Sequence, residues 1–315
     1  MKFSVPNISI TASVAELAQC IERSDGLLVL EDLPVAPFDD ILALLQNSSD
    51  VTARLNQASK VPIYNDSNSE FRPGSRLQSI DLSPKKLETM AQVDPDLINA
   101  PALSKPMEFY KAFQDKVNQK LLPALAFAIG TQDLHQDVVY SYRMLDYYPN
   151  CNEKHATVPR LAEHRDFGFL TLIQATHPGL QIKRGKRWHP LPAIPRGAAW
   201  VVFGWCAHVR SNGRIPASLH RVTKHTFLSS RVAAILFAMP ASGQTLLEPV
   251  LKGEPRTIRS GITADDLQQQ ITRSESQQQV ENWLTAPSTT APQTKKKKSG
   301  WSRVCFKCFA FYSKQ

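Results

Sequence analysis

The chain of 315 residues carries a formal net charge of +9, and 42% of its residues are hydrophobic, which is ordinary for a globular protein with a sizeable core. Residues 286–315 hold seven Lys and Arg and no Asp or Glu, so residues 1–285 carry a net charge of only +2. Nucleic-acid-binding domains spread their basic residues over a folded face, so we exclude nucleic-acid binding for residues 1–285. No apolar run approaches the ~18 residues of a transmembrane helix, no secretory signal is visible, and the five scattered Cys indicate free thiols, which together predict a cytoplasmic protein.

The N-terminal part contains short elements with clear boundaries. Ser13 and Glu16 have the spacing of a capping box, which predicts that a helix begins there. Residues 50–104 are polar and show little periodicity, so we expect surface connection over that segment, with a lid or substrate loop as the alternative. The elements expected before it are a helix over residues 13–24, a strand over 27–30 and a helix over 38–45.

A long amphipathic helix is predicted from Ser104 onward, with Pro106 inside its first turn. Pro123 lacks an N–H group, so it should kink this helix or disrupt its last turns. The apolar residues of the helix recur at helical spacing and should pack as core against a sheet; they are Phe109, Phe113, Val117, Leu121 and Leu125.

From residue 138 onward the pattern changes to short strands separated by Gly, Pro and Asn, which is typical of a sandwich or barrel. A helix rich in Gln is expected over residues 265–284. The expected strands cover residues 139–147, 168–174, 180–183, 198–203, 218–222 and 232–239.

The basic tail begins with a linker over residues 286–294 that is flexible by composition. Four lysines and then basic residues beside aromatic ones follow over 295–312, which would suit weak contact with an anionic membrane surface, and Cys305 and Cys308 could be acylated there. The alternative is a disordered tail without function.

Two histidines and one aspartate are the most informative residues of the chain. His164 and Asp166 point to the same face if they lie on an extended strand, and the β-favouring run 167–173 predicts such a strand. His220 lies 54 residues beyond Asp166 and must reach the same point from a neighbouring strand. Two imidazoles and one carboxylate form the facial triad of non-haem Fe(II) oxygenases, which leaves coordination positions open.

Arg231 opens the apolar run 231–238, which predicts a buried strand. A buried guanidinium is unfavourable unless it meets an anion. Two kinds of partner stay open: an Asp or Glu of the fold, or the carboxylate of a bound cosubstrate, which an arginine grips through two parallel hydrogen bonds.

Residues 135–240 resemble the double-stranded β-helix core of the isopenicillin-N-synthase-like Fe(II)/2-oxoglutarate-dependent oxygenases. Segment 26–31, which follows the first predicted helix, is similar to the N-terminal module of that family. The motifs that carry the resemblance follow the order and spacing of the family; they are residues 145–151 (LDYYPNC), 164–172 (HRDFGFLTL), 179–182 (GLQI), 188–191 (WHPL), 211–213 (SNG) and 218–222 (SLHRV).

The resemblance implies a mainly β fold with flanking helices (α+β) and a jelly-roll, cupin-like core. It implies an N-terminal module of helices and a strand over residues 1–134, packed on the core. The oxygenase core and a C-terminal helix would occupy residues 135–285, and a basic, disordered tail would follow over 286–315.

The resemblance also implies the reaction. The chain would oxidise a small-molecule metabolite with dioxygen, by hydroxylation, desaturation or oxidative cyclisation, while 2-oxoglutarate is decarboxylated to succinate. His164, Asp166 and His220 would hold Fe(II) as the catalytic centre, and Arg231 and Tyr148 would bind the distal carboxylate of 2-oxoglutarate.

Three further residues lie beside the motif strands and are candidates for the substrate pocket, with ordinary surface or packing roles as the alternative: Arg143, Arg160 and Trp205. The near-neutral body favours a small metabolite as partner. The sequence does not identify the metabolite or the oligomeric state.

The chain departs from the family at several positions. Ala233 stands where the family usually has Ser after the arginine, which removes one hydroxyl contact worth about 1.5–3 kcal/mol. Asp146 stands where plant members often carry Asn, and residues 203–205 (FGW) replace a stretch that is often Asn-x-Gly-Asp.

These departures keep an alternative open, a 2-oxoglutarate-independent Fe(II) oxidase of the isopenicillin-N-synthase type in which Arg231 binds a substrate carboxylate. A third hypothesis is a non-catalytic scaffold or membrane-tethered binding protein that retains the fold. The intact ligand set argues against this third hypothesis.

Overall fold

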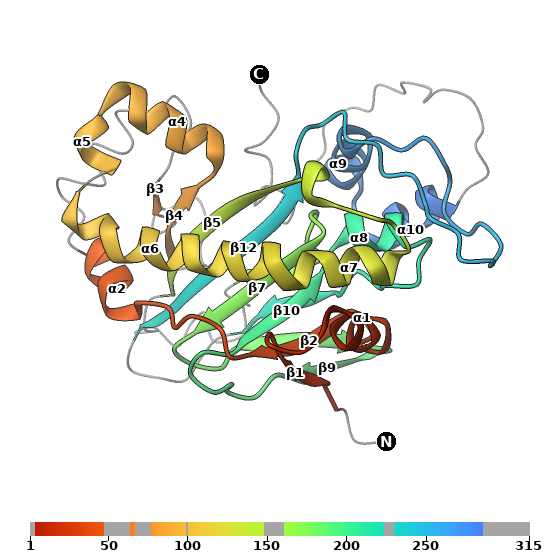
Figure 1. Ribbon diagram of the computed structural model, residues 1–315, viewed down its shortest axis with the longest axis horizontal. Coiled ribbons are helices and arrows are strands. Elements are labelled where there is room, and N and C mark those ends of the chain that lie inside the picture. The colour runs from red at the N-terminus through yellow and green to blue at the C-terminus, as the bar shows by residue number, and fades with distance from the viewer. Residues whose placement is uncertain are drawn as a thin grey trace.

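The computed structural model describes residues 4–46, 64–66, 77–98, 100–147, 161–223 and 230–285, and two β-sheets form its core (Figure 1). The strands of the larger sheet are, in spatial order, β1 (Asn7–Ser9), β2 (Leu27–Glu31), β10 (Ala199–Phe203), β7 (Leu170–Ala175), β12 (Arg231–Pro240), β5 (Val138–Tyr147), β4 (Leu77–Leu82) and β3 (Tyr64–Asp66). The strands of the smaller sheet are β6 (Leu161–His164), β11 (His220–Val222), β8 (Leu180–Arg184) and β9 (Arg187–Pro190).

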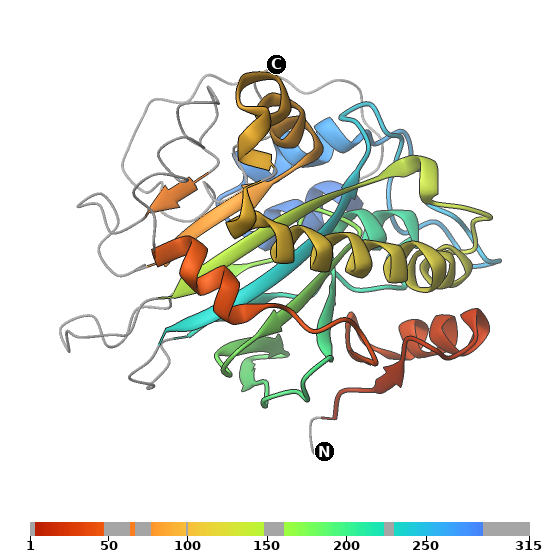
Figure 2. The same ribbon diagram turned by 60° about the vertical axis from the view of Figure 1, so that its left-hand side comes forward.

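Three consecutive helical segments cover one face of the larger sheet (Figure 1). They are α6 (Pro101–Lys116), a π-helical turn (Val117–Leu121) and α7 (Leu122–Ile129). The turned view shows β4, β5 and β12 running side by side beneath them (Figure 2). The other helices are α1 (Val14–Arg23), α2 (Phe38–Gln46), α4 (Pro84–Val93), α5 (Pro95–Ile98), α8 (Trp205–Arg210), α9 (Ala264–Arg273) and α10 (Gln277–Thr285), and a short 3-10 turn covers His135–Asp137.

Strand β5 shows how the larger sheet separates its two faces. Tyr142 packs against the aromatic rings of α6, with its ring centroid 6.0 Å from Phe109 and 5.1 Å from Tyr110. Because side chains alternate along a strand, Arg143 and Tyr147 point to the opposite face, away from α6. This inner face of the larger sheet carries the residues that surround the candidate site.

Strands from the first 134 residues extend the larger sheet at both edges. β2 pairs with β10 in antiparallel fashion, and β1 adds to β2 in parallel. At the other edge, β4 pairs with β5. The division of the chain at residue 134 stays a prediction. None of the described helices is long and apolar enough to cross a membrane.

The predicted elements of the core are confirmed to within a few residues. Ser13 and Glu16 form the capping box of α1, with both reciprocal hydrogen bonds present. The six strands predicted after residue 138 are present as β5, β7, β8, β10, β11 and β12. The disruption expected near Pro123 takes the form of the π-helical turn, and Pro123 itself lies in the first turn of α7.

The prediction of plain surface connection over residues 50–104 was wrong for its described part. That part contains β3, β4, α4, α5 and the start of α6, which begins at Pro101 rather than at Ser104. β4 lacks an apolar alternation because its buried positions include Gln78, Ser79 and Asp81. Ser83 caps α4, and proline follows at its first position, a helix signal that the sequence does carry.

Two further boundaries differ from expectation. The single helix predicted over 265–284 is two helices, because the chain leaves the helical conformation at Ser274, which has extended backbone angles. Residues 205–210, which follow the strand predicted over 198–203, form the helix α8, which no sequence pattern predicted, and this helix ends in a turn with positive φ angles at Asn212 and Gly213. The tail over 286–315 lies outside the described residues.

Candidate metal centre

His164, Asp166 and His220 converge in space. The two histidines are cross-strand partners on β6 and β11, with ring centroids 4.3 Å apart. His164 Nε2 lies 3.6 Å from Asp166 Oδ1, and His220 Nε2 lies 3.8 Å from Asp166 Oδ2. One ligand atom from each residue lies within 4.8 Å of the other two, so the three side chains could hold one metal ion.

The local backbone that produces this convergence differs from the prediction. His164 and Asp166 do not share one strand that continues through residues 167–173, because β6 ends at His164. The chain then crosses from the smaller sheet to the larger one, where β7 begins at Leu170. The amide N–H of Phe169 donates to Ala238 on β12 over 2.8 Å, which ties this crossing to the larger sheet.

The N-terminus of α8 also contacts the segment between β6 and β7, which crosses from the smaller sheet to the larger one. The amide of Trp205 donates to the carbonyl of Asp166 over 2.8 Å. A Cβ atom on Gly204 would lie 2.7 Å from that same carbonyl oxygen and 2.3 Å from the carbonyl oxygen of Gly168, so only glycine permits this approach. The sequence FGW is therefore a structural support of the aspartate.

Both imidazole rings are oriented by backbone carbonyls. His164 Nδ1 lies 2.8 Å from the carbonyl oxygen of Ala162, and His220 Nδ1 lies 3.0 Å from that of Ser218. Because a carbonyl can only accept, a neutral ring must carry its hydrogen on Nδ1, which places the lone pair on Nε2. The Nε2 atoms of both rings are those that face Asp166.

The electrostatics of the centre favour neutral histidine. Burial and, to a smaller extent, the neighbouring His220 lower the pKa of His164 to about 4, while the Asp166 carboxylate opposes the shift. Asp166 and His220 are themselves buried. His164 is therefore neutral at pH 7, which is the form that coordinates a metal.

Thr171 is a supporting residue that the sequence analysis did not single out. Its hydroxyl group lies on β7 and donates to Asp166 Oδ2 over 2.6 Å. Metal-binding carboxylates are commonly held by such a bond from outside the coordination shell. The only available signal was the position of Thr171 in an otherwise apolar strand that follows the His-x-Asp pair.

Arg231 is buried at the start of β12, with 3% of its surface exposed. Its Nε group donates to the carbonyl oxygens of His177 and Pro178, at 2.9 and 3.2 Å. Its guanidinium carbon lies 5.1 Å from the centre of the Tyr147 ring. Within the described ranges no Asp or Glu forms an ion pair with Arg231, so the structure offers no internal carboxylate partner among those residues.

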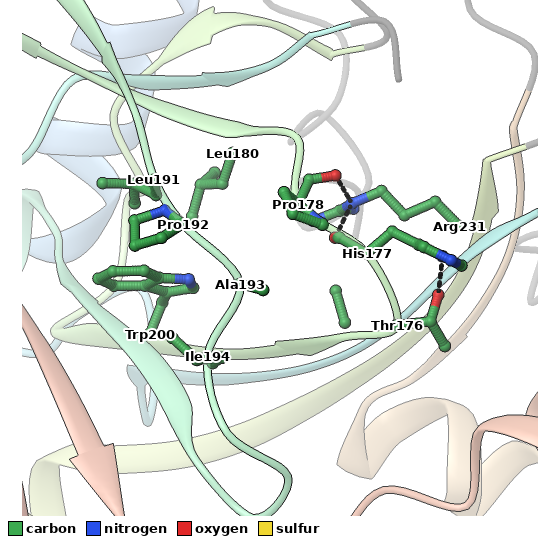
Figure 3. A pocket seen from close by; sticks show the side chains of 11 residues that line it. Thr176, His177, Pro178, Leu180, Leu191, Pro192, Ala193, Ile194, Trp200 and Arg231 are labelled. Atoms are coloured by element: carbon green, nitrogen blue, oxygen red, sulfur yellow. Dashed lines mark hydrogen bonds between the residues drawn. The ribbon is translucent and has the colours of Figure 1, made fainter. Parts of the chain in front are cut away.

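A recess opens beside Arg231 on the inner side of the larger sheet (Figure 3). Its walls come from the end of β7, the start of β8 and the segment after β9, and they are mostly apolar. Arg231 supplies the guanidinium of this recess. The lining residues are Ala175, Thr176, His177, Pro178, Leu180, Leu191, Pro192, Ala193, Ile194, Trp200 and Arg231.

The other candidate residues fall in different places. Arg143 lies on the inner face, forms an ion pair with Asp81, and its guanidinium carbon is 5.3 Å from the centre of the Phe237 ring. Trp205 is fully buried beneath Arg165, in a packing environment. Tyr148 and Arg160 lie outside the described residues.

Comparison with known proteins shows that part of the chain is similar to one family. Residues 136–240 match the family described as the 2OG-Fe(II) oxygenase superfamily. Gibberellin 3-beta-dioxygenase 3 of Arabidopsis thaliana is 30% identical over 151 residues, which are 42% of this chain and 42% of that protein. The 2-oxoglutarate-dependent dioxygenase 21, chloroplastic, of Oryza sativa subsp. japonica is 31% identical over 127 residues, or 38% of each protein. The chain spans less than half the length of these curated relatives.

Solved structures share the fold. Dioxygenase for auxin oxidation 1 from Arabidopsis thaliana, a complex with 2-oxoglutarate, gives a TM-score of 0.66 at 20% identity and covers 80% of this chain and 100% of its own. A full-length protein of Neurospora crassa, solved in complex with alpha-KG, gives 0.65 at 16% identity and covers 84% and 94%. The fold is therefore a jelly-roll core with flanking helices, and residues 136–240 within it are similar to the 2OG-Fe(II) oxygenase superfamily.

Proposed function

We propose that this protein is a non-haem Fe(II)/2-oxoglutarate-dependent oxygenase that oxidises a small-molecule metabolite. The observation that carries the proposal is the convergence of His164, Asp166 and His220 within 4.8 Å, inside the segment that matches the superfamily. Two imidazoles and one carboxylate suit Fe(II) and leave coordination positions open. When bound there, iron would supply the dioxygen chemistry that couples oxidation of the metabolite to decarboxylation of 2-oxoglutarate to succinate.

The chain's own residues would bind and orient the cosubstrate. Arg231 would grip the distal carboxylate of 2-oxoglutarate, because it is a buried cation with no carboxylate partner among the described residues. Tyr147 supports the guanidinium through its ring. Tyr148 is proposed as a second contact to the same carboxylate. With its distal end fixed, the cosubstrate is held in one orientation, which promotes reaction by positioning.

Small molecules are the proposed substrate class. The solved relatives include the same Neurospora crassa protein in complex with alpha-KG and thymine, and JOX2 in complex with 2OG, Fe and JA. Arg143 stays a proposed substrate contact because it lies on the inner face of the larger sheet, as Arg231 does. Arg160 and Trp205 stay proposals for the same role. The outcome, whether hydroxylation, desaturation or cyclisation, depends on how the substrate is held.

We also propose a cytoplasmic location, on the free thiols of Cys20 and Cys206. A fluorescent fusion of the full chain tests it, and plastid fluorescence would contradict it.

Turnover of 2-oxoglutarate tests the proposal. The purified chain is supplied with Fe(II), ascorbate, dioxygen and a panel of small carboxylic acids, terpenoids and nucleobases, and succinate is measured. We expect succinate in wild type and none in His164→Ala. Arg231→Gln should raise the KM for 2-oxoglutarate by about tenfold or more, because a hydrogen bond to a charged group is worth about 1.5–3 kcal/mol. Bound iron without succinate from any substrate would contradict the proposal.

A second function is kept open by Ala233. This residue is fully buried where the family usually carries a serine hydroxyl. In the alternative, a 2-oxoglutarate-independent Fe(II) oxidase, Arg231 would bind a carboxylate of the substrate itself. Uptake of dioxygen with Fe(II) and substrate, in the absence of 2-oxoglutarate, distinguishes this alternative from the main proposal.

A further inference from the structure

The C-terminal helix α10 reaches the metal-ligand segment through one ion pair. Glu281 Oε1 lies 2.7 Å from a terminal guanidinium nitrogen of Arg165. Arg165 stands in the chain between His164 and Asp166, so Glu281 contacts the one residue that separates the two ligands. Helix α10 lies outside the segment 136–240 that matches the superfamily.

The same guanidinium also contacts the segment that carries the third ligand. Arg165 Nε donates to the carbonyl oxygen of Ala217 over 2.8 Å. Ala217 directly precedes Ser218, whose own carbonyl orients the His220 ring. A single side chain therefore joins both ligand-bearing segments, one before β7 and one at the start of β11.

Trp205 packs against the guanidinium group of Arg165. The guanidinium carbon of Arg165 lies 5.0 Å from the centre of the Trp205 ring, and Trp205 is 1% exposed. The amide of Trp205 donates to the carbonyl of Asp166. Arg165 is thus held between an aromatic face and a carboxylate, in contact with the backbone on both sides of the metal centre.

Burial makes Glu281 the decisive partner. The side chain of Arg165 is 17% exposed, and the Glu281 carboxylate is the ion-pair partner of its guanidinium. A largely buried cation that loses its carboxylate is destabilised and tends to move toward solvent. Such a movement would release the bond to Ala217 and with it the fixed spacing between the two ligand segments.

We propose that Glu281 is a positioning residue for the metal centre, acting through Arg165 to keep His164, Asp166 and His220 at the spacing that one metal ion needs. The inference rests on the proposed metal site. Outer partners of metal ligands typically change metal affinity by about 10–100-fold. Because Glu281 acts through the backbone rather than on a ligand side chain, we expect the lower end, about tenfold.

Binding of Co(II), a spectroscopic substitute for Fe(II), tests the inference on the full chain. Wild type, Glu281→Gln and Glu281→Asp are titrated, and the dissociation constant and visible absorption spectrum are recorded. Asp137→Asn is the matched control: it breaks the Arg210–Asp137 pair, which has similar exposure (12% and 34%, against 17% and 34%) and touches no ligand segment. Thermal unfolding of the metal-free variants measures the purely structural effect of each change.

We expect Glu281→Gln to bind Co(II) about tenfold more weakly with an altered spectrum, Glu281→Asp to recover part of the affinity, and Asp137→Asn to match wild type. Equal affinity and spectrum for Glu281→Gln and wild type would overturn the inference and leave the proposed function standing. The same loss in Asp137→Asn would also overturn it, because the effect would then be structural. Failure of wild type to bind Co(II) would overturn the proposed metal site itself.

Discussion

Thr171 donates its hydroxyl hydrogen to Asp166 Oδ2 over 2.6 Å, and both residues are 2% exposed. The bond joins β7 of the larger sheet to the crossing that follows β6 of the smaller sheet. A buried hydrogen bond to a carboxylate is short and strong because one partner is charged. Thr171 therefore fixes the orientation of the single anionic ligand of the candidate metal centre.

Replacing Thr171 by Val keeps the shape of the side chain and removes the hydroxyl. We expect metal affinity to fall by about 10–100-fold, because Asp166 loses the bond that orients it. Thr171→Ser keeps the hydroxyl and should bind metal nearly as well as wild type. Titration with Co(II) compares the three proteins, and equal affinity for Thr171→Val and wild type would show that the bond is not needed.

Gly204→Ala should damage the metal centre although it replaces none of the three ligand residues. The new Cβ atom would meet the carbonyl oxygens of Gly168 and Asp166, and backbone cannot yield as a side-chain end can. We expect a lower Tm and weaker metal binding together. Gly243→Ala is the control, since the atoms nearest to its Cβ would belong to the Asp265 carboxylate, which can rotate. A normal Tm and normal metal binding in Gly204→Ala would contradict the close approach seen here.

The metal-free protein should lose stability in mild acid. The pKa of His164 falls from 6.5 to about 4 on folding, so between these values the unfolded chain binds more protons than the folded one. The free energy of unfolding should therefore decrease as pH falls from 6.5 toward 4, by about 1.4 kcal/mol per pKa unit at most. Urea unfolding with a chelator present, at several pH values, measures this, and His164→Asn should flatten the profile. Identical pH profiles for the two proteins would refute the buried neutral imidazole.

Ala233→Ser restores the hydroxyl that the family usually has. Ala233 faces Ala175 of β7 and Leu145 of β5 in the sheet, two residues from Arg231. If Arg231 binds the distal carboxylate of 2-oxoglutarate, the new hydroxyl should lower the KM for 2-oxoglutarate by about tenfold. Ala175→Ser places a hydroxyl on the neighbouring strand as a control. No change in either variant would favour the 2-oxoglutarate-independent alternative.

The core of the fold could be predicted because the sequence patterns of its strands and helices agree with the faces that are buried in the structure. β12 is apolar after Arg231 and β7 is apolar along most of its length, and α1 begins at a capping box with an apolar stripe over Leu17, Ala18 and Ile21. Such patterns fix the element and its buried face together. β4 was not predicted because it buries Gln78, Ser79 and Asp81. Buried polar residues remove the alternation of apolar and polar side chains by which a strand is recognised in sequence.

The candidate site could be predicted in its residues but not in its backbone. The spacing of His164, Asp166 and His220 indicated one metal ion, and the three side chains do converge. The break after β6 was missed because the apolar run 167–173 suggested a continuous strand, whereas contacts with α8 and β12, distant in sequence, bend the chain there. The supporting roles of Thr171 and Glu281 depend on tertiary contacts that no local pattern carries.

The proposed metal site is tested by measuring metal content after anaerobic reconstitution with Fe(II) and removal of unbound ion. We expect about one Fe(II) per wild-type chain, and close to none in each of His164→Ala, Asp166→Ala and His220→Ala, because a facial triad needs all three donors. Iron content in these three variants equal to that of wild type would contradict the proposed site, since the metal would then be held elsewhere.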